Sequence, residues 1–178
     1  MHIAYQELEK RHNSLDSERT AMREAFEQYR DFRSAQKISV NPSIISQQWD
    51  EKELATNSST KEYSHPKPVI SISSDQAKFE VSTRTLSNEF QIIVVAGCHF
   101  AGDAASAIDA NTDLRSAFEK ANAIWIASST TALDLKDFSL WKTDHPRQPL
   151  LVAYDNSDWQ NVKFDSIPAF YFFKRGPD

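Results

Sequence analysis

The sequence predicts an α/β domain in its second half, preceded by a helical N-terminal segment. From residue 69 onward, short runs of β-branched and aromatic residues alternate with stretches of helical spacing. Residues 1–37, in contrast, are dense in charged residues and contain neither glycine nor proline. Strands that alternate with helices are typical of layered α/β domains, so this fold class is the expectation.

Residues 1–37 are expected to form a long amphipathic helix, interrupted near Asn13 and Ser14, where helix-capping residues cluster. Apolar residues recur at Leu8, Leu15, Met22 and Tyr29 with a seven-residue spacing, and Phe26 and Phe32 widen this stripe. A helix packed on its own domain and a coiled coil that forms a homo-oligomer through residues 1–37 both fit the pattern. The polar companion positions, such as Arg11 and Glu18, favour the first interpretation.

Residues 38–68 hold three prolines and many Ser, Thr and Asn, which predicts a linker or irregular arm. Strands are then expected at 69–73, 78–82, 90–96, 123–127, 150–154 and 169–173, and helices at 101–108, 114–121 and 133–141. The run 90–96 is almost continuously apolar, as in a strand that is buried on both faces.

Composition excludes several classes of function. The chain of 178 residues carries 20 basic and 25 acidic side chains, a net charge of -5, so we expect no nucleic-acid partner. No apolar run approaches the roughly 20 residues of a membrane span. Five histidines without paired spacing and a single cysteine predict no metal site, and the three glycines form no phosphate-binding loop. No cofactor is therefore expected.

Cys98, the only cysteine, stands where a buried strand ends, Gly97 turns the chain and a helix begins. The first turn of a helix has unpaired amide N–H groups and a partial positive charge. Both stabilise a thiolate, which makes a cysteine at this position nucleophilic near neutral pH. His99 adds positive charge when it is protonated. The alternative is a buried structural cysteine, because free cysteine is among the most buried residue types.

A second motif lies near the C-terminus, where Ile167 and Pro168 precede the aromatic run 169–173, and Lys174 and Gly176 follow it. Together with the strand–Cys98–helix pattern, this motif resembles the thioredoxin superfamily over residues 69–178. The resemblance implies a thioredoxin-like three-layer sandwich in which Cys98 is the nucleophile and Pro168 is a cis-proline facing it. The family's usual C-terminal strand and helix have no counterpart before Asp178.

The family's redox pair is Cys-x-x-Cys, whereas this chain has Ala101 in the second position. Two explanations are open: a natural member with one thiol, or, as we favour, an engineered replacement of the second cysteine that traps a mixed disulfide. Without a resolving thiol at position 101, the chain is unable to complete turnover.

The resemblance implies a thiol–disulfide oxidoreductase that acts on protein disulfides. Cys98 would attack a disulfide, while His99, Phe100, Ile167 and Pro168 would contact the substrate. One alternative is a redox-inactive module of the same fold that assembles through its N-terminal helix, and another is an unrelated α/β domain with an inert cysteine. The polar linker and helical arm favour the periplasm or cell envelope, with the cytoplasm as the alternative.

Overall fold

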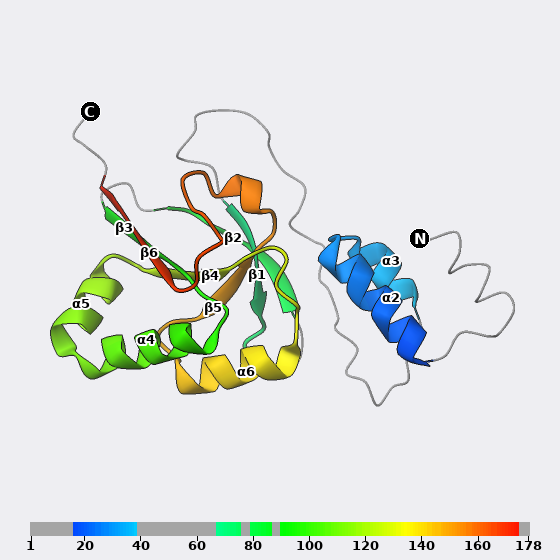
Figure 1. The fold of residues 1–178 in the computed structure, drawn as a ribbon, viewed down its shortest axis with the longest axis horizontal. Helices are drawn as coiled ribbons and strands as arrows, with labels where there is room; N and C mark the ends of the chain where they lie inside the picture. The colour runs from blue at the N-terminus through cyan, green and yellow to red at the C-terminus, as the bar shows by residue number, and fades with distance from the viewer. Residues whose placement is uncertain (1–15, 39–66, 76–78, 87–89, 175–178) are drawn as a thin grey trace, which may run out of the picture.

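A computed structural model describes residues 16–38, 67–75, 79–86 and 90–174. Within them the chain is mixed α/β, as predicted, with one six-stranded sheet in the order β2-β1-β5-β4-β3-β6 (Figure 1). The strands are β1 (Lys67–Ile72), β2 (Phe79–Arg84), β3 (Phe90–Val95), β4 (Ile124–Ala127), β5 (Leu150–Ala153) and β6 (Ala169–Lys174).

The three central strands, β3, β4 and β5, are parallel, whereas β1, β2 and β6 each run antiparallel to the neighbour on their inner side. Parallel strands require crossover connections, and here helices supply them. The helices α4 (His99–Ala110) and α5 (Thr112–Lys120) connect β3 to β4, and α6 (Leu135–Asp144) connects β4 to β5.

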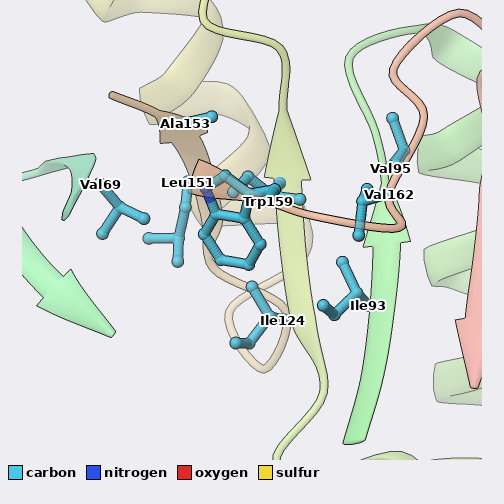
Figure 2. Packing of buried hydrophobic residues seen from close by; sticks show 9 residues of the cluster. Val69, Ile93, Val95, Ile124, Leu151, Ala153, Trp159 and Val162 are labelled. Atoms are coloured by element: carbon cyan, nitrogen blue, oxygen red, sulfur yellow. The ribbon is translucent and has the colours of Figure 1, made fainter. Parts of the chain in front are cut away.

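Alternating side chains give the sheet two apolar faces, because successive strand residues point to opposite sides. Ile92 and Val94 pack against α4 with Trp125, whereas Ile93 and Val95 belong to a separate cluster on the other face. Trp159 and Val162, from the segment between β5 and β6, cover this second face (Figure 2). Both faces of the central strands are therefore buried.

The layers differ from the expected three-layer sandwich. The helices α4, α5 and α6 lie on one face of the sheet (Figure 1). Among the described residues, the opposite face is covered by the irregular segment 154–168, which contains only the short 3-10 helix η1 (Asn156–Asp158). The segment that covers this face could not be predicted from the sequence, because the run 162–164 has only two apolar residues, Val162 and Phe164.

The predicted continuous helix at the N-terminus is wrong within the described residues. Two helices occur instead, α2 (Asp16–Gln28) and α3 (Phe32–Lys37), and the chain turns between them at Arg30, whose φ is 60°. The interruption that we expected near Asn13 and Ser14 lies outside the described residues, as do positions 1–15 of the predicted helix.

The turn redirects the apolar stripe. Phe32 is 3% exposed and packs in the core of the sheet domain with Ile70, Phe79 and Phe138, whereas Tyr29 is 81% exposed. The helices therefore pack on their own domain through α3. Homo-oligomer formation through residues 1–37 stays a prediction.

Arg30 anchors this helical pair to the sheet. Its guanidinium donates to the backbone oxygens of Ser129, Ala153 and Tyr154 at 2.6, 3.2 and 3.2 Å, at the carboxyl ends of β4 and β5 or just beyond them. Burial lowers the pKa of Arg30, while the nearby Tyr154, Asp155 and Glu27 oppose that shift. The partly buried charge is thus held by backbone carbonyls.

The remaining expected elements occur with shifted bounds. The structure begins β1 at Lys67, inside the predicted linker, begins α4 at His99 rather than at 101, and extends α6 to Asp144. Most of the predicted linker, at 39–66, and the C-terminal residues 175–178 lie outside the described residues. No helix in the described ranges is both long and apolar enough to cross a membrane.

Candidate functional site

Cys98 follows the carboxyl end of β3, which is Val95, and is the N-cap residue of α4. Gly97 makes this junction with a φ of 135°, a conformation that L side chains rarely adopt. The glycine thus turns the chain out of the buried strand and places Cys98 at the start of a twelve-residue helix.

The thiol of Cys98 is partly exposed, and no side-chain capping bond holds it. Its Sγ lies 3.7 Å from the backbone oxygen of Ile167, to which it donates a weak hydrogen bond. The backbone oxygen of Cys98 accepts from the N–H of Ala101 at 3.0 Å, which closes the first turn of α4. The sulfur therefore faces both solvent and the residue before Pro168.

The sheet register explains why Ile167 is close to Cys98. Strand β6 pairs antiparallel with β3, and Ala169, its first residue, lies opposite Val95, the last residue of β3. The residues just before β6 are thereby brought to the edge of the sheet from which Cys98 emerges. The peptide bond between Ile167 and Pro168 is cis.

Ala101 points away from this exposed surface. It is 0% exposed and packs with Ile92, Val94 and Ala105 beneath α4. A side chain at position 101 therefore lies in the core, beneath the first turn of α4. Whether Ala101 is natural or engineered stays open.

His99 and Phe100 both lie on the exposed side of the first turn of α4, with ring centroids 3.9 Å apart. Phe100 is 59% exposed and Ile167 is 40% exposed. Single exposed apolar side chains are common on proteins, but several of them gathered near a reactive group indicate a binding surface. Five of the six residues predicted for the site are thus at least partly exposed at this edge, namely Cys98, His99, Phe100, Ile167 and Pro168.

Sequence reasoning missed the exposed aromatics along the edge strand β6. Phe172 stacks on Phe90 of β3 at a centroid distance of 6.5 Å, and both are exposed. Phe170, also exposed, makes an edge contact with Phe118 and Trp125. The run 169–173 could have predicted these exposed aromatic residues. It contains four consecutive aromatic residues, and a strand places successive side chains on opposite faces.

The other potentially reactive groups do not join this site. His145 is buried at the C-terminal end of α6, where it contacts Trp141 at a ring distance of 4.6 Å. Its Nε2 would lie 3.5 Å from a Cβ at Gly102, so it packs between α6 and α4. Within the ranges that the structure describes, no cluster of three or more His, Cys, Asp or Glu side chains is arranged to hold a metal ion.

A scan against family models finds no matching family, and searches of curated proteins and of solved structures find no match. The site is therefore interpreted from its own residues and geometry.

Proposed function

We propose that the chain is a thiol–disulfide oxidoreductase with a thioredoxin-like domain, and that Cys98 exchanges with disulfides of protein substrates. The observation that carries the proposal is the position of the Cys98 sulfur. It lies at the start of α4 and 3.7 Å from the backbone oxygen of Ile167. Two segments that the sequence motif named separately thus form one exposed surface.

The position of the sulfur supports nucleophilic chemistry. The N-cap of a helix with twelve residues exposes Cys98 to the amide groups and partial positive charge of the first turn. No acidic residue lies in that first turn to oppose a thiolate. Since the thiolate is the attacking species in exchange, this environment favours reaction with a disulfide.

The exchange step balances as a substitution at sulfur. The Cys98 thiolate attacks one sulfur of the substrate disulfide, a new S–S bond forms, and the substrate's other sulfur leaves as a thiolate that takes a proton from water. Cys98 is oxidised to the mixed disulfide, and one substrate sulfur is reduced. Because position 101 holds alanine, no internal thiol attacks the mixed disulfide, which therefore persists until an external thiol releases it.

The substrate surface consists of the exposed apolar groups around the sulfur. Phe100 on α4 and Ile167 before β6 flank it, and His99 lies against Phe100. Apolar contacts of this kind would hold a substrate segment while its disulfide meets Cys98. A protein with this chemistry suits an oxidising compartment, in keeping with the periplasm or cell envelope.

The test is reaction of the folded chain with oxidised glutathione, followed by mass spectrometry. We expect a single glutathione adduct on Cys98, formed at least about tenfold faster than in the urea-unfolded chain, because only the folded chain places the sulfur beside the N–H groups of the first turn of α4. Cys98→Ser is the control and should form no adduct. A folded-state rate at or below the unfolded-state rate would reject the proposal and favour the redox-inactive assembly module.

A further inference from the structure

A pocket of about 300 Å³ lies at the edge of the sheet opposite to Cys98. Its wall includes Asn122 and Ala123, which lead into β4, and Gln148 and Pro149, which lead into β5. Cys98 instead follows the carboxyl end of β3, which is parallel to both strands. The pocket is therefore separate from the thiol site, and its function does not depend on the proposed exchange.

Three arginines line this pocket: Arg84 at the end of β2, Arg115 on α5 and Arg147 before β5. Glu119 lies in the wall and the carboxylate of Asp109 lies 3.6 Å from Arg147, so three positive charges face two negative charges. This local excess is notable in a chain whose net charge is -5. Guanidinium groups match the geometry of phosphate and carboxylate oxygens.

Asp109 on α4 organises the pocket from behind. Its backbone oxygen accepts from Arg115 Nη1 at 2.9 Å, and its Oδ1 accepts from Gln148 Nε2 at 3.0 Å. The same carboxylate lies 3.6 Å from Arg147 Nη1. Arg115, Arg147 and Gln148 of the wall are thus held by the same residue, Asp109, as expected of a preorganised site.

The pairing of Arg147 is loose. Its Nε is 3.8 Å from Glu119 Oε1, and its side chain is 54% exposed. Exposed ion pairs with this geometry contribute little, about 0–1 kcal/mol, so an incoming anion can compete for the guanidinium.

Two residues of the pocket wall, Trp125 and Gln148, each carry a buried polar atom without a hydrogen-bond partner in the described part of the chain. Trp125 Nε1 and Gln148 Oε1 are buried, and neither has a hydrogen bond within the part of the chain that the structure describes. Buried polar atoms are nearly always paired, and each exception calls for an explanation. Both atoms have almost no accessible surface, so they lie beneath the pocket wall and a ligand in the pocket does not reach them.

We propose that this pocket binds a small phosphate monoester. Its phosphate contacts Arg84, Arg115 and Arg147, and its neutral part lies against the rest of the wall, which includes Trp125 and Gln148. A phosphate monoester presents three terminal oxygens to the three guanidinium groups, whereas a single carboxylate presents two. The volume is at the lower end for ligand pockets and suits a compact molecule.

The test is calorimetric titration of the full chain with glycerol 3-phosphate, and separately with inorganic phosphate and succinate, at constant ionic strength. We expect glycerol 3-phosphate to bind more tightly than inorganic phosphate and succinate. Arg84→Gln should raise its dissociation constant at least about tenfold, since one charge-assisted contact is lost. Lys136→Gln, an exposed cation on α6, is the matched control and should leave binding unchanged.

A second readout follows the indole N–H resonances of the tryptophans in a nitrogen–proton spectrum, with Trp125 identified by Trp125→Phe. Saturation with glycerol 3-phosphate should shift the Trp125 resonance in the wild type. Three results would overturn the proposal: no binding at millimolar ligand, equal dissociation constants for Arg84→Gln and Lys136→Gln, or succinate binding as tightly as the phosphate ester. An unshifted Trp125 resonance at saturation would equally overturn it.

Discussion

Cys98 and Ile167 are 69 positions apart in the sequence, yet the sulfur of the first lies 3.7 Å from the backbone oxygen of the second. The antiparallel pairing of β3 with β6 produces this contact, because it sets Val95 opposite Ala169. An incoming sulfur that approaches Cys98 must therefore pass beside the backbone of Ile167. Any chemistry of the thiol takes place against this second segment.

Ala101→Cys should convert the chain from a trap into a catalyst. The new sulfur would lie in the core beneath the first turn of α4, one turn from Cys98, and would attack the Cys98 sulfur of a mixed disulfide from this buried side. Position 101 is closely packed, so the added sulfur must displace its neighbours. We expect this to cost no more than about 2 kcal/mol of unfolding free energy, because a single atom is added. The measurement is reduction of insulin disulfides with dithiothreitol as the electron donor.

Two controls accompany this variant. The double variant Cys98→Ser with Ala101→Cys should show no turnover above the reagent background. An Ala101→Cys chain that folds normally but keeps its glutathione adduct indefinitely would contradict the exchange mechanism.

Phe32→Ala should destabilise the whole sheet domain, although Phe32 lies in the N-terminal helical pair. The ring fills a space among Ile70, Phe79 and Phe138, and truncation leaves a cavity there. Loss of a buried phenyl group typically costs about 3–5 kcal/mol. Urea unfolding followed by circular dichroism measures the change.

Tyr29→Ala provides the matched control, because Tyr29 is aromatic, three positions away and largely exposed. It should change the unfolding free energy by no more than about 0.5 kcal/mol. Equal effects of the two substitutions would mean that α3 does not pack on the sheet as described.

Arg30→Leu should destabilise the protein by removing the donors for the backbone oxygens of Ser129 and Ala153. A backbone carbonyl that loses its partner costs about 1–3 kcal/mol when it stays buried. Arg30→Lys restores the charge without the planar set of donors, so we expect a smaller loss. Thermal unfolding of the three proteins checks this order, and a Lys variant less stable than the Leu variant would refute it.

Asp155 and Asp158 should affect acid stability in opposite directions. Hydrogen bonds from Ser157 lower the pKa of Asp155, so its ionised form favours the folded state. That stabilisation is present above its unfolded pKa and is lost as the pH falls through the lower folded value. Burial raises the pKa of Asp158, and the nearby charge of Asp155 raises it further, so ionised Asp158 disfavours the folded state.

The two asparagine variants test this difference. At pH 7 we expect Asp155→Asn to be less stable than the wild type and Asp158→Asn to be more stable, and both differences should shrink toward pH 2–3 as the carboxylates protonate. Unfolding midpoints in urea at several pH values provide the measurement. The same sign of change in both variants at neutral pH would show that the local charges do not act in this way.

Much of the sheet could be predicted because its signal is local. The runs at 90–96, 123–127 and 150–154 are apolar on both faces, and each contains a central strand. The first turn of α4 was predicted from Gly97 and Cys98 for a similar reason, since the turn needs a glycine. The role of Cys98, in contrast, stays a prediction.

What could not be predicted depends on contacts between distant residues. The helix breaks at Arg30 without a glycine or proline that would signal the break in the sequence. It depends instead on the hydrogen bonds from Arg30 to the carbonyls of Ser129 and Ala153, which are distant in the sequence. The arginines of the pocket are equally scattered, at positions 84, 115 and 147. Their proximity comes from the sheet order, which the sequence pattern does not specify.

The burial of Phe32 has a consequence for how the chain unfolds. A fragment that starts at residue 69 would lack both the ring that fills the space above Ile70 and Phe79 and the guanidinium that binds the ends of β4 and β5. Residues 16–38 and the sheet therefore belong to one cooperative unit, although a long stretch of sequence separates them. Melting should show a single transition that α2 and α3 share with the strands, and the smallest autonomous folding unit is discontinuous in sequence.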